Sequence, residues 1–175
     1  MGTIANFIGF QAGWFACVLG AAYGYLWLGP LAVAGLAVFN LKGLPPACRK
    51  RELRLLASVS LLGLVLDSLL ALSGVFTFLD RQFPPWLSRP WMVALWANFA
   101  LTLRASMQWL QERYVLGGLL GMVSGPLAYW AGARLGAVEL HGVYSLLMLA
   151  AAWSATVPFL LWLSAVPQSR PGEEK

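Results

Sequence analysis

Asp67 is the residue of this 175-residue sequence whose type and position most suggest chemistry. It lies near the middle of residues 55–79, an otherwise apolar run that is long enough to cross a bilayer. A carboxylate at the centre of a spanning helix costs roughly 2.5–3.5 kcal/mol, so it requires a partner, a proton or a water-filled cavity. Asp67 is therefore either a structural group, hydrogen-bonded to Asn98 or a hydroxyl, or a group that binds a ligand or transfers a proton.

Small residues share one helix face with Asp67, because they recur at spacings of three and four residues. They are Ser60, Gly63, Ala71 and Gly74. Such a face allows a neighbouring helix to approach closely, which predicts that Asp67 points into the bundle. Asn98 is expected at a similar depth on the next span, since both residues lie roughly 18 Å from the expected cytoplasmic ends of their helices.

Further polar side chains within apolar runs complete the candidate binding set. Arg104 lies about 9 Å from the cytoplasmic end of its span, so it either extends to the lipid headgroups or pairs with Asp67. Gln108 follows one turn later and extends this polar face. Asn6 and Gln11, near the start of the first apolar run, are expected to line a cavity or to cap a helix pair.

Glycines at a spacing of four residues predict close helix packing. Gly117, Gly121 and Gly125 form a double G-x-x-x-G pattern, and Gly9 with Gly13 forms a single one. In apolar helices this spacing brings two backbones together, within one chain or between chains.

Several classes of function find no support in the residues. His141 is the only histidine, and with Glu139 it offers too few ligands for a metal, so neither a metal nor a cofactor is predicted. No pattern of a hydrolase nucleophile, a redox cysteine pair or a phosphate loop occurs. Nucleic acid is not an expected partner, because the basic cluster at residues 42–54 lies between two apolar runs.

Composition predicts an all-α integral membrane protein. Hydrophobic residues make up 59% of the chain and charged residues 11%, against about 25% charged in a soluble domain. About six transmembrane helices are expected in one domain, residues 1–166, followed by a polar tail, 167–175. The runs are 4–41, which holds two helices with a turn at residues 23–30, then 55–79, 91–110, 115–133 and 143–165.

Charge distribution predicts the orientation. Six crossings place both termini on one side, and the loops and tail of that side would carry eight basic residues, against three on the other. By the positive-inside rule, both termini are expected in the cytoplasm, with the protein in a bacterial inner membrane.

Several segments together resemble a family of small polytopic bacterial inner-membrane proteins of unknown function. They are Asn6-Phe7 with Gln11, Glu52 followed by Gly63 and Asp67, WMVALWANFALTLRASMQWL and GPLAYWAGARLGA. The last, residues 125–137, is the most specific, and the resemblance covers nearly the whole chain. It implies a membrane location but no established activity.

Two functional hypotheses are compatible with these residues. The first is a non-enzymatic protein that handles a small solute or lipid, or assists assembly. The alternative is an intramembrane enzyme or enzyme subunit acting on membrane lipid, with Asp67 and Arg104 in its site. The partners expected are the lipid bilayer, a lipid or small apolar ligand, and either a second copy or another membrane protein.

Overall fold

The computed structural model describes residues 2–165 and is almost entirely helical. Its elements are α1 (Thr3–Ala22), α2 (Leu28–Lys42), α3 (Pro46–Leu72), β1 (Phe76–Phe78), α4 (Pro90–Leu103), η1 (Gln108–Leu110), α5 (Tyr114–Arg134), β2 (Val138–Leu140) and α6 (Val143–Ser164). Four of the helices, α1, α3, α5 and α6, are long and apolar enough to cross a membrane. The protein is an all-α membrane protein with a six-helix bundle, as composition predicts.

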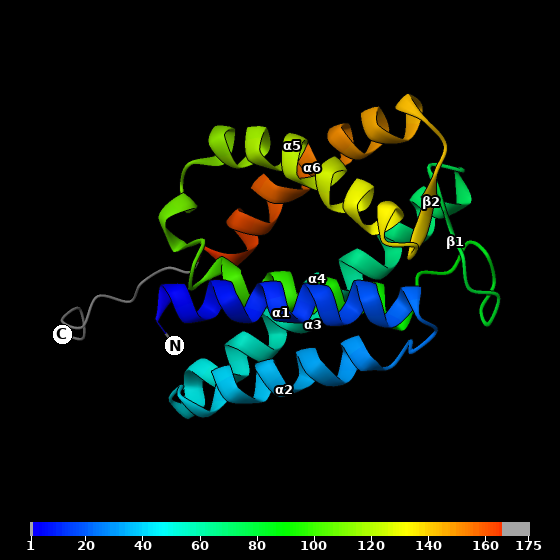
Figure 1. Ribbon diagram of the computed structural model, residues 1–175. Coiled ribbons are helices and arrows are strands. Elements are labelled where there is room, and N and C mark those ends of the chain that lie inside the picture. Colours follow the sequence, from blue (N-terminus) through cyan, green and yellow to red (C-terminus); the bar gives the residue numbers. More distant parts are fainter. Residues whose placement is uncertain (1, 166–175) are drawn as a thin grey trace, which may run out of the picture.

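Successive helices run in opposite directions (Figure 1). The start of α1 and the end of α6 lie at one end of the bundle, called here the terminal end. The two strands lie at the other, called here the strand end, where β1 and β2 pair antiparallel with Thr77 opposite Glu139. Helices α2 and α4 have only 15 and 14 residues, and both pack beside α1.

Composition predicts that the third apolar run continues as a helix to residue 79. The structure shows that this prediction is wrong. Helix α3 ends at Leu72, and Gly74 adopts a φ of 73°. The amide of Val75 then bonds the carbonyl of Leu70, and the amide of Gly74 bonds that of Ala71, which closes the helix in a Schellman motif. The apolar residues beyond it form β1, and Asp67 lies near the end of its helix and not at the middle.

Three further boundaries differ from the expected ones. Helix α3 begins at Pro46 and not at residue 55, so most of the basic cluster belongs to this helix. The first turn is shorter than residues 23–30, because Gly29 and Pro30 already belong to the first turn of α2, where proline is tolerated. The fourth helix ends at Leu103 and not at residue 110. Contacts with distant residues hold the chain after α4, since Asn6 Oδ1 accepts from the Ser106 amide at 3.3 Å.

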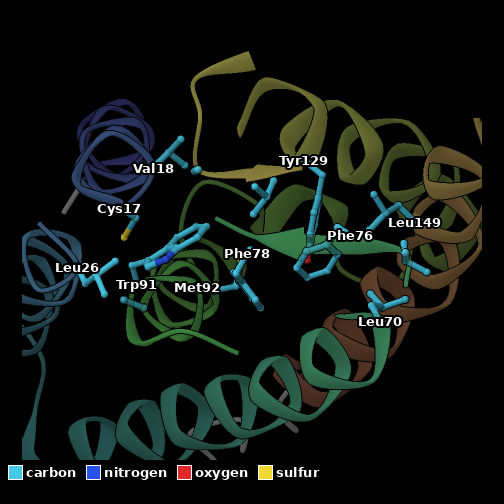
Figure 2. Packing of buried hydrophobic residues seen from close by; sticks show 14 of the residues in the cluster. Cys17, Val18, Leu26, Leu70, Phe76, Phe78, Trp91, Met92, Tyr129 and Leu149 are labelled. Carbon is cyan, nitrogen blue, oxygen red and sulfur yellow. The ribbon is translucent and has the colours of Figure 1, made fainter. Parts of the chain in front are cut away.

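Aromatic side chains fill the strand end of the core. Figure 2 shows Phe76 and Phe78 of β1 between Tyr129 of α5 and Trp91 of α4. The ring centroids of Phe76 and Tyr129 are 5.2 Å apart, and those of Phe78 and Trp91 are 6.1 Å apart. The short sheet therefore packs as a cap on the helices.

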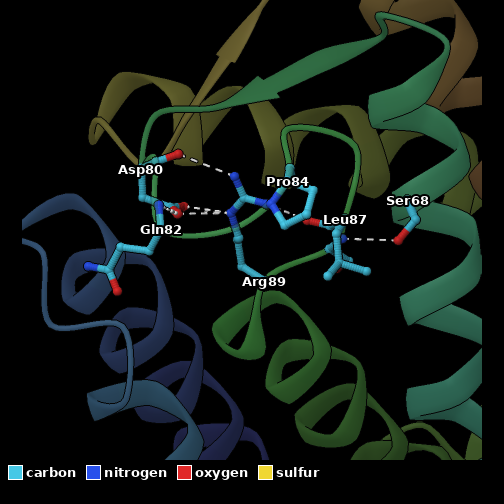
Figure 3. Close-up of polar contacts among 7 residues, drawn as sticks. Ser68, Asp80, Gln82, Pro84, Leu87 and Arg89 are labelled. Atoms are coloured by element: carbon cyan, nitrogen blue, oxygen red, sulfur yellow. Dashed lines mark hydrogen bonds and ion pairs between the residues drawn. The ribbon is translucent and has the colours of Figure 1, made fainter.

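A buried arginine organises the loop between β1 and α4 (Figure 3). Arg89 Nε donates to Asp80 Oδ2 at 2.8 Å, and its other nitrogens donate to the backbone carbonyls of Asp80, Pro84 and Leu87. The guanidinium carbon also lies 4.4 Å from the centroid of the Phe78 ring. With its donors satisfied in this way, Arg89 is a structural clamp at the strand end.

Candidate ligand-binding site

Asp67 is fully buried and joins three helices. One carboxylate oxygen accepts a hydrogen bond from Trp96 Nε1 of α4 at 2.6 Å, and the other accepts one from the Tyr129 hydroxyl of α5. Asp67 therefore meets a hydroxyl and an indole, and not Asn98. Both of its partners are donors, so the carboxylate satisfies two polar groups that would otherwise be unpaired in an apolar interior.

Gly63, one turn before Asp67, explains how the indole reaches the carboxylate. A Cβ at Gly63 would overlap the ring of Trp96, so only glycine leaves room for this side chain against α3. The Trp96 ring in turn stacks on Trp153 of α6, with centroids 4.9 Å apart and an interplanar angle of 14°. Asp67 thus sets the orientation of an aromatic pair.

That aromatic pair forms part of the wall of a cavity of about 510 Å³. Residues of α1, α4 and α5 contribute most of the lining. They are Phe10, Gln11, Trp14, Phe15 and Val18 from α1, Trp91, Met92, Leu95, Trp96 and Phe99 from α4, Leu120, Ser124, Gly125, Ala128, Tyr129 and Gly132 from α5, with Met107, Val138 and Trp153. Among the described residues, no charged side chain lines this cavity, and its volume is in the range of sites for small molecules.

The exposed residues of the cavity lining lie on α1 and α5, which are not among the helix pairs that pack closely, so the mouth of the cavity is between these two helices. At its rim Phe15 is 49% exposed and Leu120 is 41% exposed. Both lie in the interior of their helices, whereas Met107 borders the cavity toward the terminal end and Val138 toward the strand end. The mouth is therefore on the side of the bundle, between its two ends.

Two polar side chains lie at the mouth, on opposite helices. Gln11 is near the midpoint of α1 and Ser124 is at the midpoint of α5, and both are exposed. Neither side chain forms a hydrogen bond with any residue of the described range 2–165. Of the candidate binding residues, only Gln11 lines the cavity.

Asn6 and Asn98 instead join α1 to α4. Asn98 Nδ2 donates to the Phe10 carbonyl at 2.8 Å, and a Cβ at Gly13 would lie 2.7 Å from Asn98 Oδ1. Asn6 Nδ2 donates to the Leu101 carbonyl at 3.0 Å, and its Oδ1 accepts from the Ser106 hydroxyl at 2.7 Å. Gly9 is half-buried beside both asparagines. These amides are engaged in holding helices.

Arg104 pairs with a carboxylate, but not with Asp67. Its Nη1 lies 3.0 Å from Glu52 Oε2, and its Nε donates to the Ser164 carbonyl at 3.1 Å. Glu52 and Asp67 are both on α3, fifteen residues or about 22 Å apart. Gln108 is exposed at the first residue of η1, so the structure does not gather these residues around Asp67.

The glycines of α5 face α6 of the same chain. A Cβ at Gly117 would lie 2.6 Å from the Leu161 side chain, and one at Gly121 would overlap the carbonyl oxygen of Trp153. A Cβ at Gly125 would overlap the Trp153 indole. The glycines thus let the backbones of α5 and α6 approach closely, as glycines at this spacing do in other membrane helices.

Three residues of the site escaped prediction from sequence, namely Trp96, Tyr129 and Glu52 as polar partners. Gly63 carried a usable signal, because a glycine one turn from a buried acid leaves space for a large donor from a neighbouring helix. Tyr129 also follows Gly117, Gly121 and Gly125 at the same spacing, so its hydroxyl was predictably inside the bundle.

A family model described as a protein of unknown function (DUF2878) matches residues 3–159. The chain belongs to this family. The match includes Asp67, its two partners and every residue that lines the cavity. Comparisons with curated proteins and with solved structures gave no match.

Proposed function

We propose that this protein binds an apolar ligand, taken up laterally from the bilayer, in the cavity between α1, α4 and α5. The observation that carries the proposal is the uncharged, aromatic-lined cavity of about 510 Å³, with its mouth between two helices at mid-depth. A lipid chain entering there leaves hydrocarbon for an interior of similar polarity, and gains close packing against rings such as Trp14 and Phe99.

We favour binding over catalysis because the polar groups are occupied elsewhere. Each oxygen of Asp67 already accepts a hydrogen bond, one from Trp96 and one from Tyr129, and Arg104 is bonded to Glu52 about 22 Å along α3. The alternative, a lipid-modifying enzyme using Asp67 with Arg104, requires these residues to meet at one substrate. In the proposal Asp67 is a positioning residue for the cavity wall.

Photolabelling tests the proposal. The purified protein in nanodiscs is labelled with a long-chain hydrocarbon that carries a diazirine, and the modified residues are mapped by mass spectrometry. We expect labels on cavity residues such as Trp14, Leu95 and Ala128. Ala128→Phe, which fills the cavity, should reduce this labelling at least threefold.

Ala12→Phe is the matched control, because Ala12 is exposed on α1 and does not line the cavity. It should leave the labelling of the cavity unchanged. Labels confined to exposed outer residues such as Trp130, or equal cavity labelling in both variants, would overturn the proposal.

We further propose a bacterial inner-membrane location with the terminal end in the cytoplasm. Support comes from Lys42 and the basic residues in the first turns of α3, which lie at the terminal end, against Arg81, Arg89 and Arg134 at the strand end. Arg170 and Lys175 lie outside the described residues. Reporter fusions after Lys42 and after Arg89 should report opposite sides, the first cytoplasmic.

A further inference from the structure

We infer that the ligand is an uncharged lipid with a hydrogen-bonding group, a hydroxyl or a carbonyl, that Gln11 binds at the mouth of the cavity. The inference rests on the proposed function and names the chemistry of the ligand. It starts from the polarity of Gln11, which is the one primary amide among the residues that line the cavity. Apart from the Ser124 hydroxyl, the other lining side chains are aromatic, thioether or aliphatic.

The amide of Gln11 differs from the asparagine amides of the α-helices. Asn6, Asn40 and Asn98 each donate to a backbone carbonyl, at 3.0, 2.9 and 2.8 Å. Gln11 makes no such bond to any residue in the described part of the chain, although it lies near the midpoint of α1. An unpaired amide at this depth is costly in hydrocarbon, so we infer a partner from outside the described residues, which the ligand supplies.

Ser124 repeats this pattern on the opposite side of the mouth. Serine and threonine in apolar helices often bond their own backbone, as Ser68, Ser154 and Thr156 do at 2.6, 2.8 and 2.8 Å. Ser124 makes no side-chain hydrogen bond within residues 2–165. Two unsatisfied polar groups at similar depth, one from α1 and one from α5, therefore face the same opening.

The cavity lining has no charged side chain among the described residues, which favours an uncharged ligand. A phosphate or ammonium group inside this cavity would meet no opposite charge among the described residues, because Arg89 pairs with Asp80 and Arg104 with Glu52. Burying an unpaired ion is far more costly than burying a hydroxyl or carbonyl. Gln11, with both a donor and an acceptor, suits such a neutral group.

Competition against the diazirine hydrocarbon tests the inference. Dodecanol and dodecane have the same chain length and differ in one hydroxyl. In the wild-type protein, dodecanol should halve the cavity labelling at a three- to tenfold lower mole fraction in the bilayer than dodecane, the range expected for one hydrogen bond in a membrane. In Gln11→Leu the two competitors should become equal within twofold, while labelling by the hydrocarbon persists.

The outcomes separate the two proposals. Persistent labelling shows that Gln11→Leu still folds and keeps its cavity, and Gln11→Asn, which retains an amide, should restore part of the preference. Equal competition by dodecanol and dodecane in the wild type, or an unchanged preference in Gln11→Leu, would refute the role of Gln11 and leave lateral binding intact. Absence of cavity labelling in the wild type would refute lateral binding itself.

Discussion

The two sides of α5 show how one apolar helix can be closed against one neighbour and open toward another. On the closed side, Gly117 and Gly121 bring the backbone of α6 so close that a Cβ would overlap it or its side chains. On the open side, Leu120, Ser124 and Ala128 face α1 across the cavity. Both sides are similarly apolar, so hydrophobicity does not distinguish them.

Residue size, and not polarity, therefore determines which face of α5 packs closely. Lipid is as apolar as leucine, so a face gains from packing only where small residues allow many close contacts. Glycines repeat every four residues where α5 meets α6, whereas Leu120, Ser124 and Ala128 each place a side chain toward α1. The open side consequently retains a volume that a ligand can occupy.

The largest expected effect is on the closed side. Gly121→Leu should lower the free energy of unfolding by about 3 kcal/mol, because the side chain would displace the backbone of α6 at Trp153. Reversible denaturation in mixed detergent micelles measures this. Leu119→Ala, at a position 53% exposed on the same helix, should change stability by less than about 0.5 kcal/mol. A neutral Gly121→Leu would show that α5 packs through another face.

Asp67 bonds Tyr129, which lines the cavity, and Trp96, which stacks on Trp153 of α6. Its variants should have an intermediate effect on the free energy of unfolding. Asp67→Leu leaves the Trp96 indole and the Tyr129 hydroxyl unpaired, which should cost about 2 kcal/mol in the same assay. Asp67→Asn should cost less than about 1 kcal/mol, because its oxygen can accept from Trp96 while its amide donates to the Tyr129 oxygen.

Cavity labelling distinguishes a structural Asp67 from a binding one. Asp67→Asn should label like the wild type if Asp67 only positions Trp96 and Tyr129. A folded Asp67→Asn protein that no longer takes up the hydrocarbon would instead assign Asp67 a direct role in binding.

The smallest effect on stability is expected on the open side. Ala128→Leu should change the free energy of unfolding by less than about 0.5 kcal/mol, because the added atoms enter the cavity and displace no packed group. The same denaturation assay measures it beside Gly121→Leu. A loss as large as that of Gly121→Leu would mean that the cavity is closed in solution and that the two sides do not differ.

Much of the fold was predictable because its signals are local. Charge depletion over long runs predicts spanning helices, and glycine spacing predicts the closed face of α5. The ends of helices were less predictable, since residues 75–79 are as apolar as the helix before them. Gly74 ends α3 there, and the residues beyond it become a strand because β1 pairs with β2, about sixty residues later in the chain.

The order of residues along the chain is enough to predict spanning helices, a partner for Asp67 and the packing of α5 through its glycines. Each of these three properties follows from the residues of one segment and from the apolar lipid around it. The packing of the helices is needed to see that Asp67 bonds Trp96 and Tyr129 and that Arg104 bonds Glu52. It also leaves Gln11 without a partner in the described part of the chain, at an open cavity. Apolar faces look alike along the chain, and only the arrangement of the helices determines which of them meet and which remain apart.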